Sequence, residues 1–233
     1  MFLIGCMALA SAGPLRDAGE VGEGPAALVV VTPGVHASAY DGWIEAIEDR
    51  GMDAWLFEMD PGLKAEAMPA LLAQAAAHLT EQRGAVRVAA HGWGGVYALT
   101  AGVEAEHWAL IGVPLAAQPV AGPLEGPRWP WPQTLVGELP HAAAPEGSLA
   151  IYRGWVAEFP SYPPPTSPTL LIASGMDVVA PPEVVRLPSQ GWSQRTWERA
   201  GFLSLSGADP THAELLQDAG VARRVAKFLE EGE

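Results

Sequence analysis

The sequence predicts an α/β protein: a three-layer sandwich with helices on both faces of a mostly parallel, doubly wound sheet of about six strands. Short apolar runs rich in β-branched residues, such as 26–31 (AALVVV) and 169–174 (TLLIAS), are typical of parallel strands buried on both faces. These runs alternate with segments whose apolar residues recur at helical spacing, as over 63–83. With 233 residues, of which 49% are apolar, the chain can form one domain with a sizeable core.

The expected elements alternate along the chain. Strands are predicted at 26–31, 53–59, 86–90, 107–112, 169–174 and 194–199. Helices are predicted at 38–50 with Ser38 as the cap, at 63–83, 96–104 and 148–159, from 181 onward, and as a closing helix that starts at His212. Pro69 either kinks the helix at 63–83 or marks its true start.

Residues 26–233 are expected to form the single domain, and residues 1–25 an N-terminal apolar segment and linker. Residues 1–12 (MFLIGCMALASA) have no basic n-region and are too short to span a membrane as a helix. The stretch that ends at Cys6 resembles a bacterial lipobox. Two localisations therefore stay open: cytoplasmic, or an exported lipoprotein anchored through Cys6 if the start of the chain is truncated. Residues 15–25 are rich in glycine and acidic residues, which indicates a linker.

Residues 113–167 interrupt the alternation. They are rich in proline, contain no clean strand pattern and carry three tryptophans. We expect this segment to be a short cap insertion over the mouth of the sheet. Its apolar inner surface would come from Trp129, Trp131 and Trp155, since aromatic rings bury much area with few rotamers to fix.

Composition argues against several classes of partner. The net charge of −14 disfavours nucleic acid, whose phosphates require clustered lysine and arginine. A single cysteine excludes an internal disulfide and a cysteine-based metal cluster. Four histidines, His36, His78, His107 and His141, show no metal-ligand spacing with one another or with a carboxylate. We expect no metal, no cofactor and no integral membrane span.

The stretch 86–99 (VRVAAHGWGGVYAL) predicts a strand, a sharp turn and a helix in that order, which is the arrangement of a nucleophile elbow. The pattern for such an elbow is small-x-Ser-x-Gly, and here it reads Ala90-His91-Gly92-Trp93-Gly94. Gly92 occupies the nucleophile position, so the nucleophile's side chain is absent. The turn itself should hold residue 92 at positive φ.

Asp177 and His212 follow the elbow in the order that an α/β serine hydrolase requires. Asp177 comes shortly after a buried strand, where it would orient an imidazole, and His212 would reach the elbow as general base. Each residue alone also fits a purely structural role. Functional residues of parallel sheets gather at the carboxyl ends of the strands, and this edge should bring together Gly34, Gly92, Asp177 and His212.

Four phrases carry a resemblance to the α/β-hydrolase superfamily, in its esterase, lipase and epoxide-hydrolase-like branch: VTPG with the helix start after it, AAHGWGG, PTLLIASGMDVVAPPE and THAELL. The resemblance covers about residues 26–229. It implies that the backbone N–H groups of Val35 and Trp93 donate to an oxyanion. Two departures are Thr32-Pro33-Gly34, where many members have His-Gly, and Gly92, where the family has Ser, Asp or Cys.

Three functions stay open. The favoured hypothesis is a non-catalytic pseudo-hydrolase that binds a small apolar or ester-like ligand, or a protein partner. The alternatives are an active esterase-type hydrolase, in which His212 activates water or Ser174 or Ser193 acts as nucleophile, and an envelope lipoprotein that uses the fold as an interaction surface. The expected ligand pocket is lined by Gly34, His36, His91, Trp129, Trp131 and Trp155.

Overall fold

A computed structural model describes the sheet, its covering helices and the loops at the carboxyl edge of the strands. The described residues are 15–18, 24–32, 35–58, 67–115, 162–175, 177, 180, 182, 185, 201–205, 210, 212 and 214–232. The expected cap insertion at 113–167, including its three tryptophans, lies largely outside these ranges, as do residues 1–14 with Cys6.

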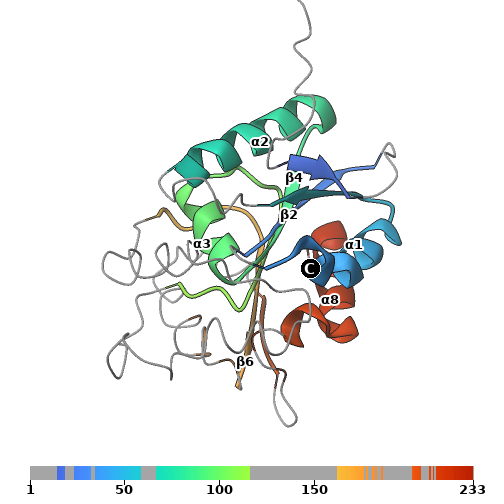
Figure 1. The fold of residues 1–233 in the computed structure, drawn as a ribbon, viewed down its shortest axis with the longest axis vertical. Helices are drawn as coiled ribbons and strands as arrows, with labels where there is room; N and C mark the ends of the chain where they lie inside the picture. Colours follow the sequence, from blue (N-terminus) through green and yellow to red (C-terminus); the bar gives the residue numbers. More distant parts are fainter. Residues whose placement is uncertain are drawn as a thin grey trace, which may run out of the picture.

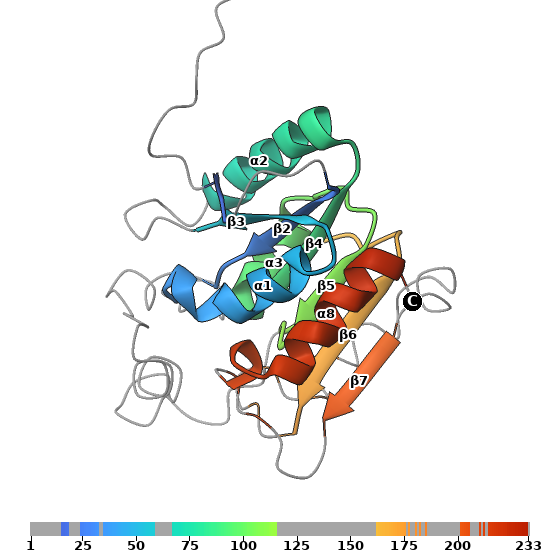
Figure 2. The ribbon, with the colours of Figure 1, turned by 90° about the vertical axis from the view of Figure 1, so that its right-hand side faces the viewer.

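The described strands form one sheet in the order β1-β3-β2-β4-β5-β6-β7, and every neighbouring pair from β3 to β7 is parallel (Figure 2). This arrangement confirms the predicted α/β class. The strands are β1 (Leu15–Asp17), β2 (Ala26–Val30), β3 (Asp53–Phe57), β4 (Val86–His91), β5 (Trp108–Ile111), β6 (Thr169–Ser174) and β7 (Gly201–Leu205).

Helices cover both faces of the sheet. On one face α1 packs against α8, and on the other α2 packs against α3 (Figures 1 and 2). The helical elements are η1 (Ala37–Tyr40), α1 (Asp41–Glu48), α2 (Met68–Arg83), α3 (Gly92–Thr100), η3 (Glu214–Leu216) and α8 (Ala219–Glu231). Within the described residues, no helix is long and apolar enough to cross a membrane.

Burial on both faces explains the apolar strand sequences. All five residues of β2 and all four of β5 are buried, because helices lie above and below these central strands. The predicted strand at 169–174 is confirmed residue for residue as β6.

Several helix starts differ from the sequence expectation, among them that of α3, which begins at Gly92 and not at 96. α2 begins at Met68 and carries Pro69 in its first turn, where the missing N–H costs no hydrogen bond, so Pro69 marks the start and causes no kink. The expected cap Ser38 lies inside η1. The capping residue is instead His36, whose Nδ1 accepts a hydrogen bond from the Ser38 N–H at 3.2 Å.

The two edge strands were not predicted. Leu15–Asp17, expected within a linker, pairs antiparallel with β3 as β1, and Arg16 forms an ion pair with Glu58 at 3.3 Å. β7 at Gly201–Leu205 pairs with β6, whereas the strand predicted at 194–199 lies outside the described residues. β1 has only three residues, which leaves little periodicity to detect.

The close approach of α3 to β2 predicts a steric requirement at Gly94. A Cβ atom there would lie 2.7 Å from the carbonyl oxygen of Val30, which is backbone and cannot move aside. We expect Gly94→Ala to lower the free energy of unfolding by about 1–3 kcal/mol, as overpacking does.

Gly42→Ala in α1 is the matched control for this change, because nothing lies within 4 Å of an added Cβ there. We expect it to raise stability by about 0.5–1 kcal/mol, since alanine favours a helix over glycine. Urea unfolding of both variants measures the contrast. Equal stability of the two would contradict the close packing of α3 on β2.

Candidate active site

The elbow is built where β4 meets α3 without an intervening residue. His91 ends the strand with extended backbone angles, and Gly92 starts the helix at φ +52°. The predicted positive φ is confirmed. This left-handed conformation strains any residue with a Cβ and costs glycine little.

Asp177 lies three residues beyond β6 and is held by its own turn. Its backbone N–H donates to the Ser174 carbonyl at 3.1 Å, and its Oδ1 accepts a hydrogen bond from the Ala180 N–H at 2.8 Å. The other carboxylate oxygen, Oδ2, lies 2.7 Å from Nδ1 of His212. The turn thus aims the buried carboxylate at the imidazole, and the expected contact between the two residues is present.

His212 lies in the loop before η3 and is 3% exposed. This corrects the expectation that it starts the closing helix. α8 begins at Ala219, where Oδ1 of Asp218 caps it by accepting from the Val221 N–H at 2.8 Å. An Asp before a helical segment outcompetes the earlier residues as its cap.

Glycines at positive φ line the Asp177–His212 pair on two sides. A Cβ on Gly92 would lie 2.9 Å from Nε2 of His212 and 2.9 Å from Oγ1 of Thr32. A Cβ on Gly112, at φ +54°, would lie 2.9 Å from Oδ2 of Asp177 and 3.0 Å from Nδ1 of His212. The imidazole therefore packs directly against both backbones.

His91 lies beneath His212 and connects it to the sheet. Its Nε2 is 3.0 Å from the carbonyl oxygen of His212, and the two ring centroids are 4.3 Å apart. Its Nδ1 is 2.9 Å from Oγ1 of Thr32, which also donates to the His91 carbonyl at 2.6 Å. The rings of Tyr40 and Trp43 meet the His91 ring edge-on, each at 6.3 Å. His91 is thus fixed on every side.

These partners determine the tautomer of His91. A carbonyl oxygen only accepts, so we assign the proton of the neutral ring to Nε2. Nδ1 is then an acceptor, and the single proton of the Thr32 hydroxyl is shared between Nδ1 and the His91 carbonyl. Burial lowers the pKa of His91 well below 6.5, and the neighbouring His212 lowers it further, while the bond to the His212 carbonyl acts in the opposite direction. The ring is neutral at neutral pH.

Tyr40 extends this buried group to the start of α1. The Thr32 N–H donates to its hydroxyl oxygen at 2.8 Å, and burial raises the pKa of Tyr40 above its usual value of 10.0. Tyr40 also contacts Trp43 edge-to-face, with 5.6 Å between the ring centroids. A chain of contacts therefore runs from α1 through Thr32 and His91 to His212.

The other expected site residues divide into three groups. The N–H of Val35 donates to the Thr32 carbonyl at 3.1 Å, and Trp93 is the second residue of α3. His36 is exposed and caps η1. Gly34, Trp129, Trp131 and Trp155 lie outside the described residues.

Ser174 is occupied by a structural bond, because its hydroxyl donates to the carbonyl of Pro210, two residues before His212. The other suggested nucleophile, Ser193, lies outside the part of the chain that the structure describes. Among the described residues, no group of three or more histidine, cysteine and carboxylate side chains could hold a metal ion.

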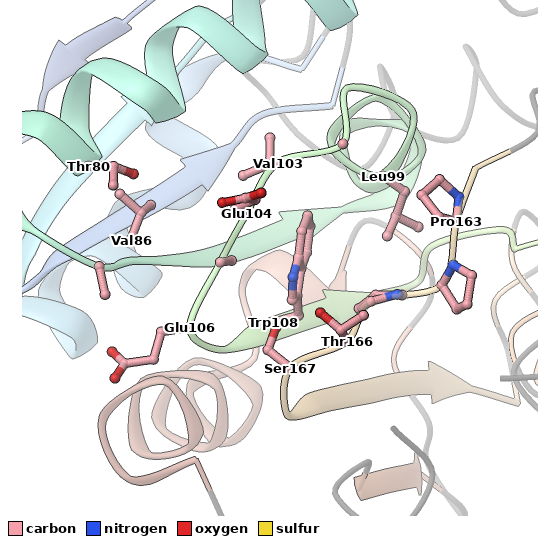
Figure 3. A pocket seen from close by; sticks show the side chains of 15 residues that line it. Thr80, Val86, Leu99, Val103, Glu104, Glu106, Trp108, Pro163, Thr166 and Ser167 are labelled. Atoms are coloured by element: carbon pink, nitrogen blue, oxygen red, sulfur yellow. The ribbon is translucent and has the colours of Figure 1, made fainter. Parts of the chain in front are cut away.

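A cavity of about 480 Å³ opens at the opposite, amino edge of the sheet (Figure 3). Trp108, Leu99, Val103 and residues 163–167 line it. Another, of about 570 Å³, lies between α1 and the start of α8. Gly92, Asp177 and His212 line neither cavity, so neither belongs to the candidate site.

Solved structures share this architecture. A monoacylglycerol lipase from Paleococcus ferrophilus matches 90% of this chain and 96% of its own at 16% identity, with a TM-score of 0.64. A metagenome-derived lipolytic enzyme of the LipS and LipT pair matches 93% and 97% at 18% identity and a TM-score of 0.65. A lidless α/β serine hydrolase from Xanthomonas campestris matches 94% and 85% at 14% identity and a TM-score of 0.57.

This chain has the α/β-hydrolase fold. No protein-family model and no curated protein matches its sequence, so the likeness lies in the fold. In this fold the nucleophile stands at the turn between the elbow strand and its helix, which is the position of Gly92.

Two residues of this site, Thr32 and Gly112, were missed as site residues from the sequence. Thr32 follows the strand predicted at 26–31, and Gly112 is the last residue of the strand predicted at 107–112, at the same edge as Gly92. Their positions at strand ends were the available signal. A small or hydroxyl residue after a strand is common, however, so the pattern alone did not single them out.

The buried neutral His91 predicts acid sensitivity. Because its folded-state pKa lies below that of the unfolded chain, the unfolded state binds more protons below pH 6.5, and the stability that the neutral ring contributes is lost as pH falls. We expect His91→Gln to weaken the decline of unfolding free energy from about pH 8 to about pH 5.

His78→Gln in α2, which changes a half-exposed histidine, is the control and should leave this decline unchanged. Urea unfolding across the pH range measures both variants. A His91→Gln curve parallel to that of the unchanged chain would show that His91 titrates normally.

Proposed function

We propose that this protein is a non-catalytic member of the α/β-hydrolase fold, which binds a small apolar or ester-like ligand without covalent chemistry. The observation that carries the proposal is the backbone at residue 92, which has the elbow conformation and no side chain. A hydrolase of this type needs a nucleophile within hydrogen-bond reach of its base.

The packing around Gly92 supports this proposal. In an active site Nε2 of the base stands a hydrogen bond away from the nucleophile's oxygen, which lies beyond the Cβ. Here Nε2 of His212 lies 2.9 Å from the place of the Cβ itself. The imidazole and the Thr32 hydroxyl therefore pack into the region that a serine side chain would fill.

A second candidate, weak hydrolysis by His212 acting on water, is favoured by the retained Asp177–His212 contact of 2.7 Å. Fold and binding alone leave about 10³–10⁴-fold acceleration over water when triad members are removed. A short-chain fluorogenic ester separates the two candidates. Turnover that is lost in His212→Ala would overturn the non-catalytic proposal and establish the second candidate.

Ligand binding is tested by the melting temperature of the unchanged chain in the presence of short- and medium-chain esters. We expect esters to raise it without being consumed, because a ligand that binds only the folded state stabilises that state. A melting temperature that no ester in the series moves would leave a protein partner as the remaining ligand class.

Placing a serine hydroxyl at position 92 tests whether the other residues of the site can support hydrolysis. Gly92→Ser should lower stability by roughly 1–3 kcal/mol, because a Cβ is strained at this φ and crowds His212 and Thr32. We also expect it to acquire labelling by a fluorophosphonate at position 92, measured by mass spectrometry, and slow ester turnover.

Gly92→Ala is the matched control, since it adds the same Cβ without a hydroxyl. It should lose similar stability and remain unlabelled. Gly92→Ser could also fold and yet neither react with the fluorophosphonate nor turn over ester. In that case the other residues of the site, and not only residue 92, differ from those of a hydrolase.

A further inference from the structure

The loop that carries His212 is tied to the sheet at three described points. Asp177 contacts the imidazole, Ser174 donates to the carbonyl of Pro210, and His91 meets the carbonyl of His212. The first two ties come from β6 and the loop after it. The third comes from β4, the elbow strand itself, and from the residue directly before Gly92.

We propose that His91 is a positioning residue: its Nε2–H holds the main chain of His212, and this bond sets where the imidazole stands over residue 92. The proposal rests on the proposed function only in taking residues 92, 177 and 212 as the site. No contact of His91 with a ligand is required, because it acts through His212.

The surroundings of His91 suit this role. The ring is fully buried, and its Nδ1 contacts the Thr32 hydroxyl, whose backbone N–H is in turn bonded to Tyr40. A donor with both ends of its ring fixed has one orientation, so the carbonyl that it binds has one position. Burial also strengthens the bond, because no water competes for the Nε2–H.

The His91 bond also couples the elbow to the base. His91 and Gly92 are neighbours in sequence, so any shift of the turn moves the donor that holds His212. Asp177, in contrast, contacts the ring itself from the turn after β6. We infer that Asp177 sets the ring's orientation and His91 sets its height above residue 92.

A thiol placed at position 92 reports on this geometry. In a Cys6→Ser background, which removes the chain's only cysteine, Gly92→Cys puts a sulfur beside Nε2 of His212. A neighbouring imidazolium stabilises a thiolate, so iodoacetamide should alkylate the thiol readily even at about pH 6. Adding His212→Phe should abolish this reactivity. The rate of that variant is the baseline for a thiol at position 92 without a neighbouring imidazole.

His91→Phe removes the donor and keeps most of the ring volume. We expect it to slow alkylation at about pH 6 by about tenfold or more, equivalent to one unit of thiol pKa, and to leave the rate at about pH 9 unchanged. His91→Gln, whose amide supplies an N–H near the position of Nε2, should restore much of the rate. Simple unfolding would also remove the activation at about pH 6, but it would expose the thiol and raise the rate at about pH 9, so an unchanged rate at about pH 9 separates lost positioning from lost fold.

A second measurement needs no change at residue 92. In the chain labelled with ¹⁵N-histidine, the Nδ1 proton of His212 should give a resolved signal, since it is buried against Asp177. We expect this signal to broaden in His91→Phe and to return in His91→Gln, with His78→Gln as the control.

An alkylation rate at about pH 6 that is unchanged in His91→Phe would overturn the positioning role. If the thiol variant does not fold, an unchanged His212 signal in His91→Phe would overturn it instead. These outcomes are independent of the proposed function, because no ester is used. Ester turnover by the unchanged chain would contradict the proposed non-catalytic function, but it would not affect the positioning role of His91.

Discussion

The hydrogen bond from His91 to the carbonyl of His212 joins the two halves of the site, and the arrangement of the carboxyl edge depends on it. One partner ends the central strand β4, and the other lies 121 residues further along the chain. Thr32, from the loop after β2, and Tyr40, at the end of η1, complete the buried group. A polar cluster at this depth is stable only when its donors and acceptors are paired.

Glycine is what makes this arrangement compact. Gly92 and Gly112 both adopt positive φ, and both backbones touch the Asp177–His212 pair where other residues would present a Cβ. The two positions lie at the ends of neighbouring strands β4 and β5. Glycine at these two positions therefore lets the imidazole pack directly against both backbones.

Sequence patterns were informative where burial is uniform. β2, β5 and β6 are buried along their whole length, so their apolar runs identified them, and the order of Gly92, Asp177 and His212 identified the edge where they meet. The contribution of Thr32 and Gly112 depends on distances across the edge, which no local pattern contains. Capping by His36 in place of Ser38 was missed for a related reason, because both residues are plausible acceptors and the backbone chooses between them.

The short strand β1 has a consequence for the sheet as a whole. A parallel sheet ends in unpaired N–H and C=O groups, which can template the pairing of a second chain. Leu15–Asp17 covers that side of β3, and the N–H of Ala18 continues the pairing by donating to the carbonyl of Ala54 at 3.0 Å. These three residues, whose sequence resembles a linker, thus protect the edge of β3 from pairing with the edge of another molecule. A truncated chain that starts at Ala26 would expose this edge of β3 to self-association.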